Sequence, residues 1–400
     1  MAAQRGHFEF LDGLRGWAAL AVVFFHLGID RPETERVLDA LPSFVVDDLA
    51  GRGNLGVAVF FVLSGFVIAY SLRSNLADHE MPNESNGTKP EPNSRSLPGG
   101  RTFSFENFMA RRIVRLTPPY YVAIAVSLVF AAGAAIQGDH AYLPGYEPFS
   151  WNRFAAHLVY VQEFFGFENF NDVFWTLAIE MQFYAAFGIM VLAYQGLGRR
   201  WSSRTARSLL YGGSALVAVL WPLGLFRGDE RAVWFLPLWY AFMLGVLVFA
   251  RWQRQIPSVA LGGYLAVLGI APLVHQTGGE FVWAAVITGG ALWYGTEQKL
   301  LGRWLADPVS QFLGRISYSL YLFHTPVLGA ALVAVSVVVS DTLAWQIVGV
   351  IVATVAALVS AEIAYRLVEA PAIAWGRRLK KGPQSTTGSA RRLARQQPAT

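Results

Sequence analysis

The 400-residue sequence contains no cysteine, which excludes disulfides, thiolate nucleophiles, cysteine-ligated zinc and iron–sulfur clusters. Charge is also scarce: Asp, Glu, Lys and Arg make up 15% of the chain, against about 25% in a typical soluble domain. Hydrophobic residues make up 54%, and long uncharged runs recur along the whole sequence. These features predict an all-α membrane protein, a helix bundle that crosses the bilayer many times.

Windows of about 20 predominantly apolar residues mark the candidate transmembrane helices. The first of them superficially resembles a signal peptide. Glu9 and Asp12 stand where a positive n-region belongs, and no small-residue cleavage motif follows promptly, so we expect a retained first span. In all, the sequence predicts about ten spans, at residues 10–28, 54–72, 118–136, 173–195, 208–225, 232–250, 257–274, 281–295, 309–336 and 343–366.

The net charge of +5 follows the predicted topology. With the N-terminus inside, the basic clusters RRIVR (111–115), RRWSSRTAR (199–207) and RWQR (251–254) fall on the cytoplasmic side, as does the basic C-terminal end. The predicted outer connections hold few Lys or Arg residues, which is the asymmetry of the positive-inside rule. We therefore expect both termini in the cytoplasm. The excess charge indicates topology and contact with membrane lipid, and not a nucleic-acid partner.

Two polar stretches lie outside the predicted spans. Residues 74–104 are rich in Pro, Asn, Ser and Gly, which predicts a flexible cytoplasmic loop, and residues 381–400 are expected to form a disordered basic tail. We thus expect one membrane domain over residues 1–380. The outer loop at 137–172 combines acidic with aromatic residues and is large enough to shape a substrate entrance. We find no internal sequence repeat, which removes one support for a transporter.

The first predicted span, DGLRGWAALAVVFFHLG (12–28), carries ionisable residues at both ends, although each costs about 3 kcal/mol or more in the middle of a bilayer. Arg15 and His26 are eleven residues apart, which places them within about 20° on one helical face and about 16 Å apart along the axis. Asp12 precedes Arg15 by one turn and is close enough to pair with it. Such a polar stripe must face protein or a water-filled cavity. The alternative is an interfacial Asp12–Arg15 anchor, with His26 as a snorkelling end residue.

A single carboxylate lies within the fourth predicted span. The segment WTLAIEMQFY places Glu180 about 10 Å from the start of that span, with Thr176 and Tyr184 on the same face. Because Thr176 and Tyr184 can only donate hydrogen bonds to it, a charged Glu180 needs a cation or an imidazole from another span. We name His26 and Arg15 as the candidates. A Glu180–His26 pair would fix the imidazole tautomer as the acid of a catalytic triad does.

The ninth predicted span carries a second polar stripe. In SYSLYLFHTP (317–326), the residues Ser317, Tyr321 and His324 follow one another at spacings of four and three. Pro326 comes next and is expected to kink the helix. Aromatic stripes with one histidine often serve packing and a hydrogen bond alone, so a structural role for His324 stays open.

Two further motifs each allow both a functional and a structural interpretation. RRIVRLTPPYY lies at the inner mouth of the third span, where Arg111 and Arg115 are neighbours on a helix and could grip a phosphate with two guanidinium groups. The alternative is ordinary cytoplasmic charge. In FFVLSGFVIAY (60–70), Ser64 and Gly65 favour close approach of two helices over a nucleophile.

Six segments, in their order along the chain, resemble the acyltransferase-3 family of integral-membrane O-acyltransferases. They are FLDGLRGWAALAVVFFH, FFVLSGF, FMARRIVRLTPPYY, WTLAIEMQFY, LGRISYSLYLFHTPV and YRLVEAP, and the resemblance runs from Phe8 to Arg378. It implies transfer of an acyl group, often acetyl, from cytoplasmic acyl-CoA to a hydroxyl of a surface polysaccharide, lipopolysaccharide, peptidoglycan or small molecule. It also implies a place in the bacterial inner (plasma) membrane. Some relatives carry an extracytoplasmic hydrolase-like domain, and we expect this chain to act without one.

The resemblance also implies roles for individual residues. Arg15 and His26 match the signature pair of the family, in which an arginine and a histidine are separated by ten residues. Arg112 and Arg115 match its R-x-x-R element. Glu180 matches the acid of the W-S/T-L-x-x-E segment. Many relatives have a second glutamate directly after that acid where this chain has methionine, so a role that needs two adjacent carboxylates is in doubt.

We therefore predict an acyl-CoA-dependent O-acyltransferase, with acetyl-CoA as the expected donor, a sugar or glycan hydroxyl as the acceptor and no metal. The long arm of the donor would carry the thioester partway through the membrane to His26, the general base, because imidazole exchanges protons near neutral pH. Two other classes stay open: a secondary transporter or flippase of a sugar-linked or lipid substrate, and a non-catalytic membrane scaffold. The predicted catalytic residues are His26, Glu180 and Arg15, and the predicted donor-binding residues are Arg15, Arg111, Arg112, Arg115, Tyr321 and His324.

Overall fold

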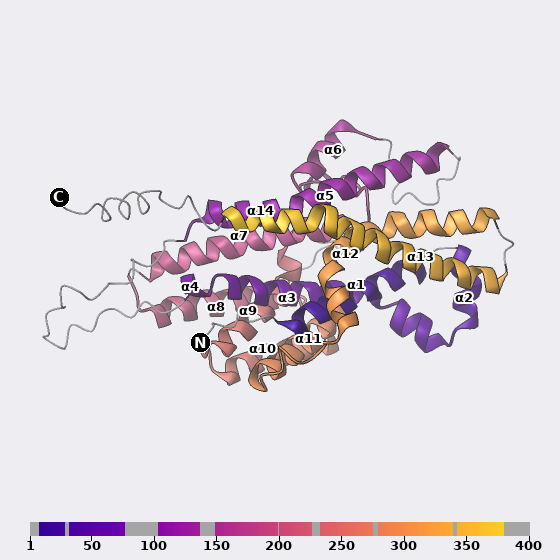
Figure 1. The fold of residues 1–400 in the computed structure, drawn as a ribbon. Helices are drawn as coiled ribbons and strands as arrows, with labels where there is room; N and C mark the ends of the chain where they lie inside the picture. The colour runs from indigo at the N-terminus through magenta and orange to yellow at the C-terminus, as the bar shows by residue number, and fades with distance from the viewer. Residues whose placement is uncertain are drawn as a thin grey trace, which may run out of the picture.

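The structure is a computed structural model that describes residues 8–28, 32–76, 103–136, 149–198, 200–225, 233–274, 279–338 and 342–379. Every regular element in these ranges is helical, as the sequence predicts, and most of the long helices run along one common direction (Figure 1). The α-helices are α1 (Glu9–Gly28), α2 (Glu35–Ala40), α3 (Gly56–Ser71), α4 (Arg73–Leu76), α5 (Phe105–Ile136), α6 (Trp151–Leu158), α7 (Phe174–Leu197), α8 (Ser203–Val219), α9 (Trp239–Trp252), α10 (Ser258–Val274), α11 (Gly279–Glu297), α12 (Pro308–Val338), α13 (Leu343–Ala364) and α14 (Ala370–Leu379). Two π-helical turns, Phe44–Ala50 and Tyr365–Glu369, and short 3-10 turns complete the described elements.

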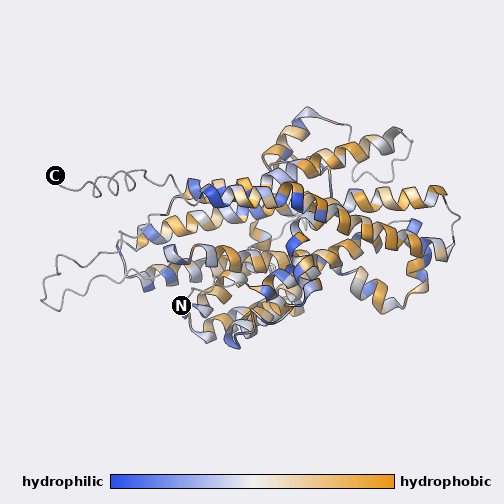
Figure 2. Ribbon diagram, viewed as in Figure 1, coloured by the Kyte–Doolittle hydropathy of each residue, from blue (hydrophilic) through white to orange (hydrophobic). Residues whose placement is uncertain are grey.

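Six stretches of the described chain are long and apolar enough to cross a membrane. They are α1, Gly53–Ser71 around α3, Phe105–Gly133 in α5, α7, α12 and Leu343–Arg378, which joins α13 to α14. Two other helical stretches are apolar but shorter, and α8 and α11 account for the last two predicted spans. Each predicted span thus has its helix, and apolar residues dominate the long helices (Figure 2). How many of them cross, and on which side each terminus lies, remain predictions.

α1 packs extensively against α12. A Cβ atom on Gly16 would collide with the backbone of α12 at Gly314, and a Cβ on Gly314 would collide with the carbonyl of Asp12. Glycine at both places therefore lets the two backbones approach, as small residues do between membrane helices. The contact brings the polar stripe of α1 against the polar stripe of α12.

A second close contact joins α3 to α9. A Cβ on Gly65 would collide with the carbonyl of Phe242, and a Cβ on Gly245 would collide with the carbonyl of Val62. The predicted role of Gly65 in close helix approach is confirmed. The side chain of its neighbour Ser64 points into the interior of the bundle, where it donates a hydrogen bond to Glu180 of α7.

The helical path of the C-terminal part changes direction within α12 and after α13. Pro326 lies inside α12, whose two halves run in different directions in Figure 1, as the proline predicts. After α13, the π-helical turn Tyr365–Glu369 leads into α14, which packs against α5. In Figure 1, α4 and the end of α14 lie at one end of the bundle, and α2 lies at the other. The predicted loop 74–104 and the tail 381–400 fall almost wholly outside the described residues.

Candidate active site

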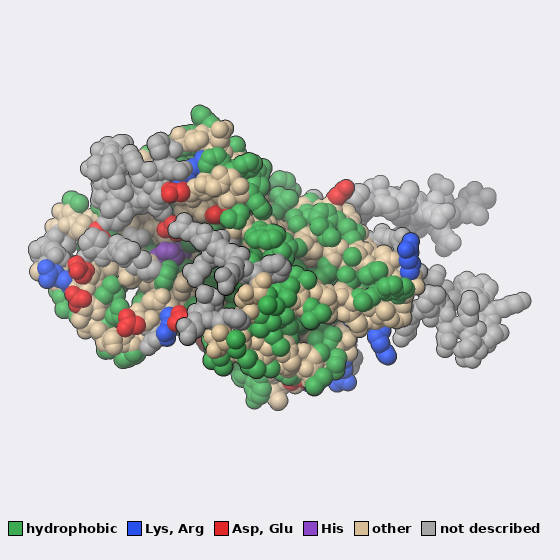
Figure 3. Space-filling view, turned by 180° about the vertical axis from the view of Figure 1, so that it is seen from behind, with side chains coloured by type: hydrophobic (Ala, Val, Ile, Leu, Met, Phe, Trp, Pro, Cys, Tyr) green, Lys and Arg blue, Asp and Glu red, His purple; other side chains and the backbone are tan. Residues whose placement is uncertain are grey.

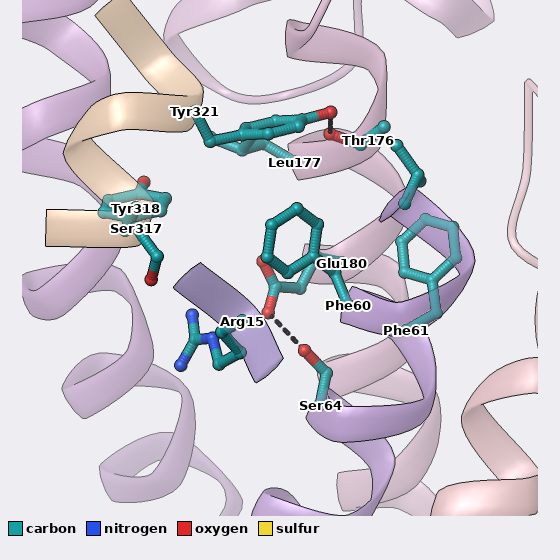
Figure 4. Close-up of a pocket in the computed structure, with 11 residues that line it drawn as sticks. Arg15, Phe60, Phe61, Ser64, Thr176, Leu177, Glu180, Ser317, Tyr318 and Tyr321 are labelled. Carbon is teal, nitrogen blue, oxygen red and sulfur yellow. Dashed lines mark hydrogen bonds between the residues drawn. The ribbon is translucent and has the colours of Figure 1, made fainter. Parts of the chain in front are cut away.

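Two adjoining cavities lie inside the bundle, among α1, α3, α5, α7 and α12. Arg15, Ser64 and Glu180 line both of them and so form the boundary that the cavities share. Figure 4 shows these three side chains converging from α1, α3 and α7. The cavity volumes are about 40 and 20 Å³, which is room for a few water molecules and no more.

Glu180 projects from α7 into this shared region. Its Oε1 accepts a hydrogen bond from Ser64 Oγ at 3.0 Å and a second one from the hydroxyl of Tyr184, one helical turn away. The sequence placed Tyr184 on the correct face. The expected hydrogen bond to His26 is not formed, because the polar partners of Glu180 are Ser64 and Tyr184, and His26 lines neither cavity. Of the two candidates named from the sequence, Arg15 shares the cavity with Glu180 (Figure 4).

Arg15 faces the cavity from α1. Among the described residues it makes no hydrogen bond and no ion pair, so its N–H donors are presented to the cavity. The expected pair between Asp12 and Arg15 is not formed. The backbone of Asp12 packs against Gly314 of α12, whereas the side chain of Arg15 lines the two cavities.

The second cavity opens between the two arginines that α5 contributes. Arg112 donates from Nη2 to Ser71 Oγ at 3.0 Å, and its guanidinium lies 5.1 Å from the centre of the Tyr184 ring. Arg115 lines the same cavity. Arg111 does not line either cavity, and its carbonyl faces α14. The two arginines of α5 that face this cavity together are therefore Arg112 and Arg115. The phosphate grip by Arg111 and Arg115 that their spacing suggests stays a prediction.

The other end of the first cavity is closed by aromatic side chains. The hydroxyls of Tyr321 and Thr176 are 2.8 Å apart, which joins α12 to α7 (Figure 4). The ring of Phe60 packs edge-on against Tyr321, with the ring centres 5.4 Å apart. Ser317 lines the cavity one turn before Tyr321, as the spacing predicts. Donor binding by Tyr321 stays a prediction.

Beyond Tyr321, two histidines meet. His324 of α12 is fully buried, and its Nε2 lies 3.1 Å from Nδ1 of His26 on α1. The other ring nitrogen of His324, Nδ1, lies 3.0 Å from the carbonyl oxygen of Leu320 and 2.9 Å from that of Tyr321. His26 Nδ1 also lies 2.9 Å from the carbonyl oxygen of Val22. The sequence singled out both histidines but not their contact.

Figure 3 shows the opposite face of the molecule, where a histidine side chain is visible at the bottom of a hollow with acidic side chains near its rim. Of the described histidines, His157 and His324 are 0% exposed, whereas His26 is partly exposed. Of the histidine pair, His324 thus lies within the packed interior, whereas His26 reaches the surface of the protein.

The segment before α7 is anchored beside the histidine pair. Asn171 is 2% exposed, and its Nδ2 donates to the carbonyl of Leu322 at 3.2 Å. Thr325 donates from Oγ1 to Oδ1 of the same asparagine at 2.6 Å. Leu322 and Thr325 flank His324 in α12, so this part of the predicted outer loop is tied directly to the element that carries the buried histidine.

A third described histidine, His157 of α6, has a structural environment. Its Nδ1 donates to the carbonyl of Arg153 at 2.8 Å, and its Nε2 accepts from the backbone N–H of Phe170 at 3.3 Å. Burial lowers the pKa of His157 from 6.5 to about 4, because removal from water disfavours the charged ring. The Arg153 guanidinium in turn donates to the carbonyls of Glu168 and Asn169. This network holds the segment in shape, and burial keeps the His157 ring neutral near pH 7.

Sequence reasoning missed several polar residues around the site. Ser64 was assigned to packing, yet it is a hydrogen-bond partner of Glu180. Glu369 is 4% exposed and accepts a hydrogen bond from Ser319 at 2.6 Å. The available signal was the YRLVEAP segment, which contains this carboxylate. Asn171 carried no signal, because its partners lie far away in the sequence. Within the described ranges, no group of three His, Asp or Glu residues is placed to hold a metal ion.

Comparisons with known proteins bear on this geometry. The family model described as an acyltransferase domain matches residues 8–362. A protein of Komagataeibacter xylinus that carries the provisional name membrane-bound transacylase is 29% identical over 380 residues, covering 90% of this chain and 81% of the relative. The peptidoglycan O-acetyltransferase of Listeria monocytogenes is 24% identical over 391 residues, covering 90% of this chain and 55% of the relative.

A protein of Bacillus subtilis, provisionally named a peptidoglycan O-acetyltransferase, is 24% identical over 393 residues and covers 90% of this chain. The chain spans 54% of that relative and 55% of the Listeria protein, which is about half of their length. No solved structure matches the chain.

Proposed function

Because the chain belongs to the acyltransferase-3 family, we propose that it is an acyl-CoA-dependent O-acyltransferase of the bacterial inner membrane. The proposed donor is acetyl-CoA from the cytoplasm, and the proposed acceptor is a hydroxyl of a sugar or glycan presented from the outside. One observation carries the proposal: polar groups follow one another through an apolar bundle. Arg112 and Arg115 come first, Arg15 with Glu180 next, and the histidine pair last.

The arginines suit the charged part of the donor. Arg112 and Arg115 lie in the same cavity, and a guanidinium binds phosphate oxygens through a planar pair of N–H groups. Three arginines and one glutamate, Glu180, line that cavity, so its charge attracts an anionic donor. Arg15 stands about 16 Å from His26 along α1, from eleven residues at about 1.5 Å each. Arg15 therefore binds the arm of the donor in this proposal, and it does not touch the reacting carbonyl.

His26 supplies the chemistry. Its Nε2 takes the proton of the acceptor hydroxyl while the hydroxyl oxygen attacks the carbonyl carbon of the thioester. The carbon–sulfur bond then breaks, and the leaving thiolate takes the proton back from Nε2. The products are an ester on the acceptor and free CoA. The cavity has room for only a few water molecules in the described conformation, so in this proposal it widens when the donor binds.

The proposal is tested with purified full-length protein in liposomes, acetyl-CoA labelled in the acetyl group, and a cell-envelope extract as the source of acceptors. We expect label in an ester bond to an acceptor with the wild-type protein, and none with His26→Ala at equal protein. Mild alkali should release the label as acetate. Label that accumulates inside the liposomes with no covalent bond would instead indicate the transporter.

A further inference from the structure

We infer that His324 is a positioning residue, which holds His26 in the tautomer that a general base requires. The inference rests on the proposed function, in which His26 is the base. Its structural basis is the contact between His324 Nε2 and His26 Nδ1, 3.1 Å apart. Glu180, the residue expected from the sequence to play this part, hydrogen-bonds to Ser64 and Tyr184 instead.

The hydrogen-bond network determines which ring nitrogens carry protons. A carbonyl oxygen can only accept, so His324 Nδ1, which lies against the carbonyls of Leu320 and Tyr321, carries a proton. In the neutral ring the Nε2 of His324 is then an acceptor. His26 Nδ1 faces that acceptor and the carbonyl of Val22, so it must carry a proton too. The lone pair of His26 is thereby placed on Nε2, the atom that takes the proton in the proposed reaction.

The position of His324 is fixed on several sides. Its ring is 0% exposed, and its Nδ1 is bonded to its own helix. Tyr321 on one side is bonded to Thr176 of α7. Thr325 on the other side is bonded to Asn171. A side chain held in this way can orient its neighbour at little further entropic cost.

A neutral imidazole suits this place better than a carboxylate. When His26 accepts a proton at Nε2, its Nδ1–H becomes a stronger donor, and the Nε2 of His324 stabilises the imidazolium by accepting it. With both rings neutral, the pair adds no charge, whereas an ionised carboxylate would be costly to bury in an apolar bundle. His324 therefore supplies the orienting hydrogen bond without a permanent charge in the apolar bundle.

Two substitutions of His324 separate orientation from packing. His324→Gln places its side-chain oxygen near the position of Nε2 and keeps an acceptor for His26, whereas His324→Phe keeps the ring shape and removes the acceptor. We expect His324→Phe to lower kcat at least about 100-fold, with the KM for acetyl-CoA within about twofold of wild type. His324→Gln should recover at least tenfold of that loss. Equal kcat values for the two variants, or a loss that follows Tm, would overturn the inference.

A second measurement keeps this inference separate from the proposed function. Histidine ring nitrogens labelled with ¹⁵N report the tautomer by NMR, and the His26 signals are identified by their absence from His26→Ala. We expect the Nδ1–H tautomer for His26 in the wild type and in His324→Gln, and a tautomer mixture in His324→Phe. An Nε2–H tautomer in the wild type overturns the inference even if transfer activity is found. If no acceptor is ever acylated, the proposed function fails while the tautomer is still decided.

Discussion

The hydroxyl of Ser319 donates to the carboxylate of Glu369 over 2.6 Å and joins the middle of α12 to the π-helical turn that follows α13. Both residues are buried, at 0% and 4% exposed. Arg15 and Arg115 attract this carboxylate from the cavity side. Glu369 therefore lies near the arginine-lined cavity, and its bond to Ser319 ties the turn after α13 to α12, the helix that carries Ser317 and Tyr321. Wide π-turns of this kind are frequent at functional sites.

The Ser319–Glu369 bond should contribute measurably to stability. Glu369→Gln keeps an oxygen for the Ser319 hydroxyl, whereas Glu369→Leu leaves that hydroxyl buried with no acceptor, which costs about 1–3 kcal/mol. We expect a lower Tm in detergent for the leucine variant than for the glutamine variant. Adding Ser319→Ala to Glu369→Leu should restore most of the loss, because both polar partners are then gone. Equal Tm values for the two single variants would contradict this role.

The three neighbouring arginines of α5 should differ in donor binding. Removing Arg112 and Arg115 together, as Arg112→Gln with Arg115→Gln, should raise the KM for acetyl-CoA at least about tenfold, since each charged hydrogen bond contributes about 1.5–3 kcal/mol. Arg111→Gln is the matched control, because its side chain lines neither cavity, and its KM should stay within about twofold. Added salt should weaken donor binding in the wild type and less so in the double variant. A similar KM in all variants would leave the cluster as a determinant of topology alone.

Glu180 should affect donor binding more than proton transfer. Glu180→Gln keeps an oxygen for Ser64 and Tyr184 but removes the carboxylate from a cavity that three arginines line. The more positive cavity should bind the anionic donor more tightly, so we expect a KM lowered a few-fold and a kcat within about tenfold of wild type. Ser64→Ala, which removes one hydrogen bond and no charge, is the control. A kcat as low as that of His26→Ala would return Glu180 to the role first expected from the sequence.

The sequence correctly predicted those features of the site that depend only on the spacing of residues along one helix. The spacing of Ser317 and Tyr321 gave their common face, and the turn from Glu180 to Tyr184 gave a hydrogen bond. Prediction from the sequence failed where the position of a side chain depends on how its helix is rotated about its axis relative to the neighbouring helices. Pitch alone cannot say whether Arg111 or Arg112 faces the cavity, because the packing of α5 against α14 and α7 decides it.

Contacts between distant segments were also beyond the sequence. His26 and His324 are 298 residues apart, and only the glycine-mediated crossing of α1 and α12 brings their rings together. Glycine at Gly16 and Gly314 is compatible with many folds, so a single sequence gives no reason to pair these two helices. The tautomer of His26, and with it the role of His324, follows from that contact.

The membrane topology is open to a direct test because the chain has no native cysteine. Single cysteines at the exposed positions Ser202 and Gln253 should react with an impermeant reagent only from the cytoplasmic side, and those at Ser43 and Asn152 only from the outside. Ser202, Gln253 and Ser43 lie next to α8, α9 and α2, and Asn152 lies in the first turn of α6, so together they fix four connections. Labelling of Ser202 and Asn152 from the same side would contradict the predicted ten-span arrangement.

The folding stability of the segment around α6 should decrease as the pH falls below 6.5. His157 has its pKa lowered to about 4 in the folded segment by burial, against 6.5 for an ordinary histidine. Between these values the unfolded segment binds a proton that the folded segment does not, so folding stability falls as the pH drops from 6.5 toward 4, by up to about 3 kcal/mol. Hydrogen exchange of the backbone N–H of Phe170, which donates to His157 Nε2, should lose protection across this range after correction for the intrinsic rate. His157→Gln keeps an acceptor for that N–H but cannot titrate there, so its protection should be nearly independent of pH. The same pH dependence in both proteins would assign the change to other groups.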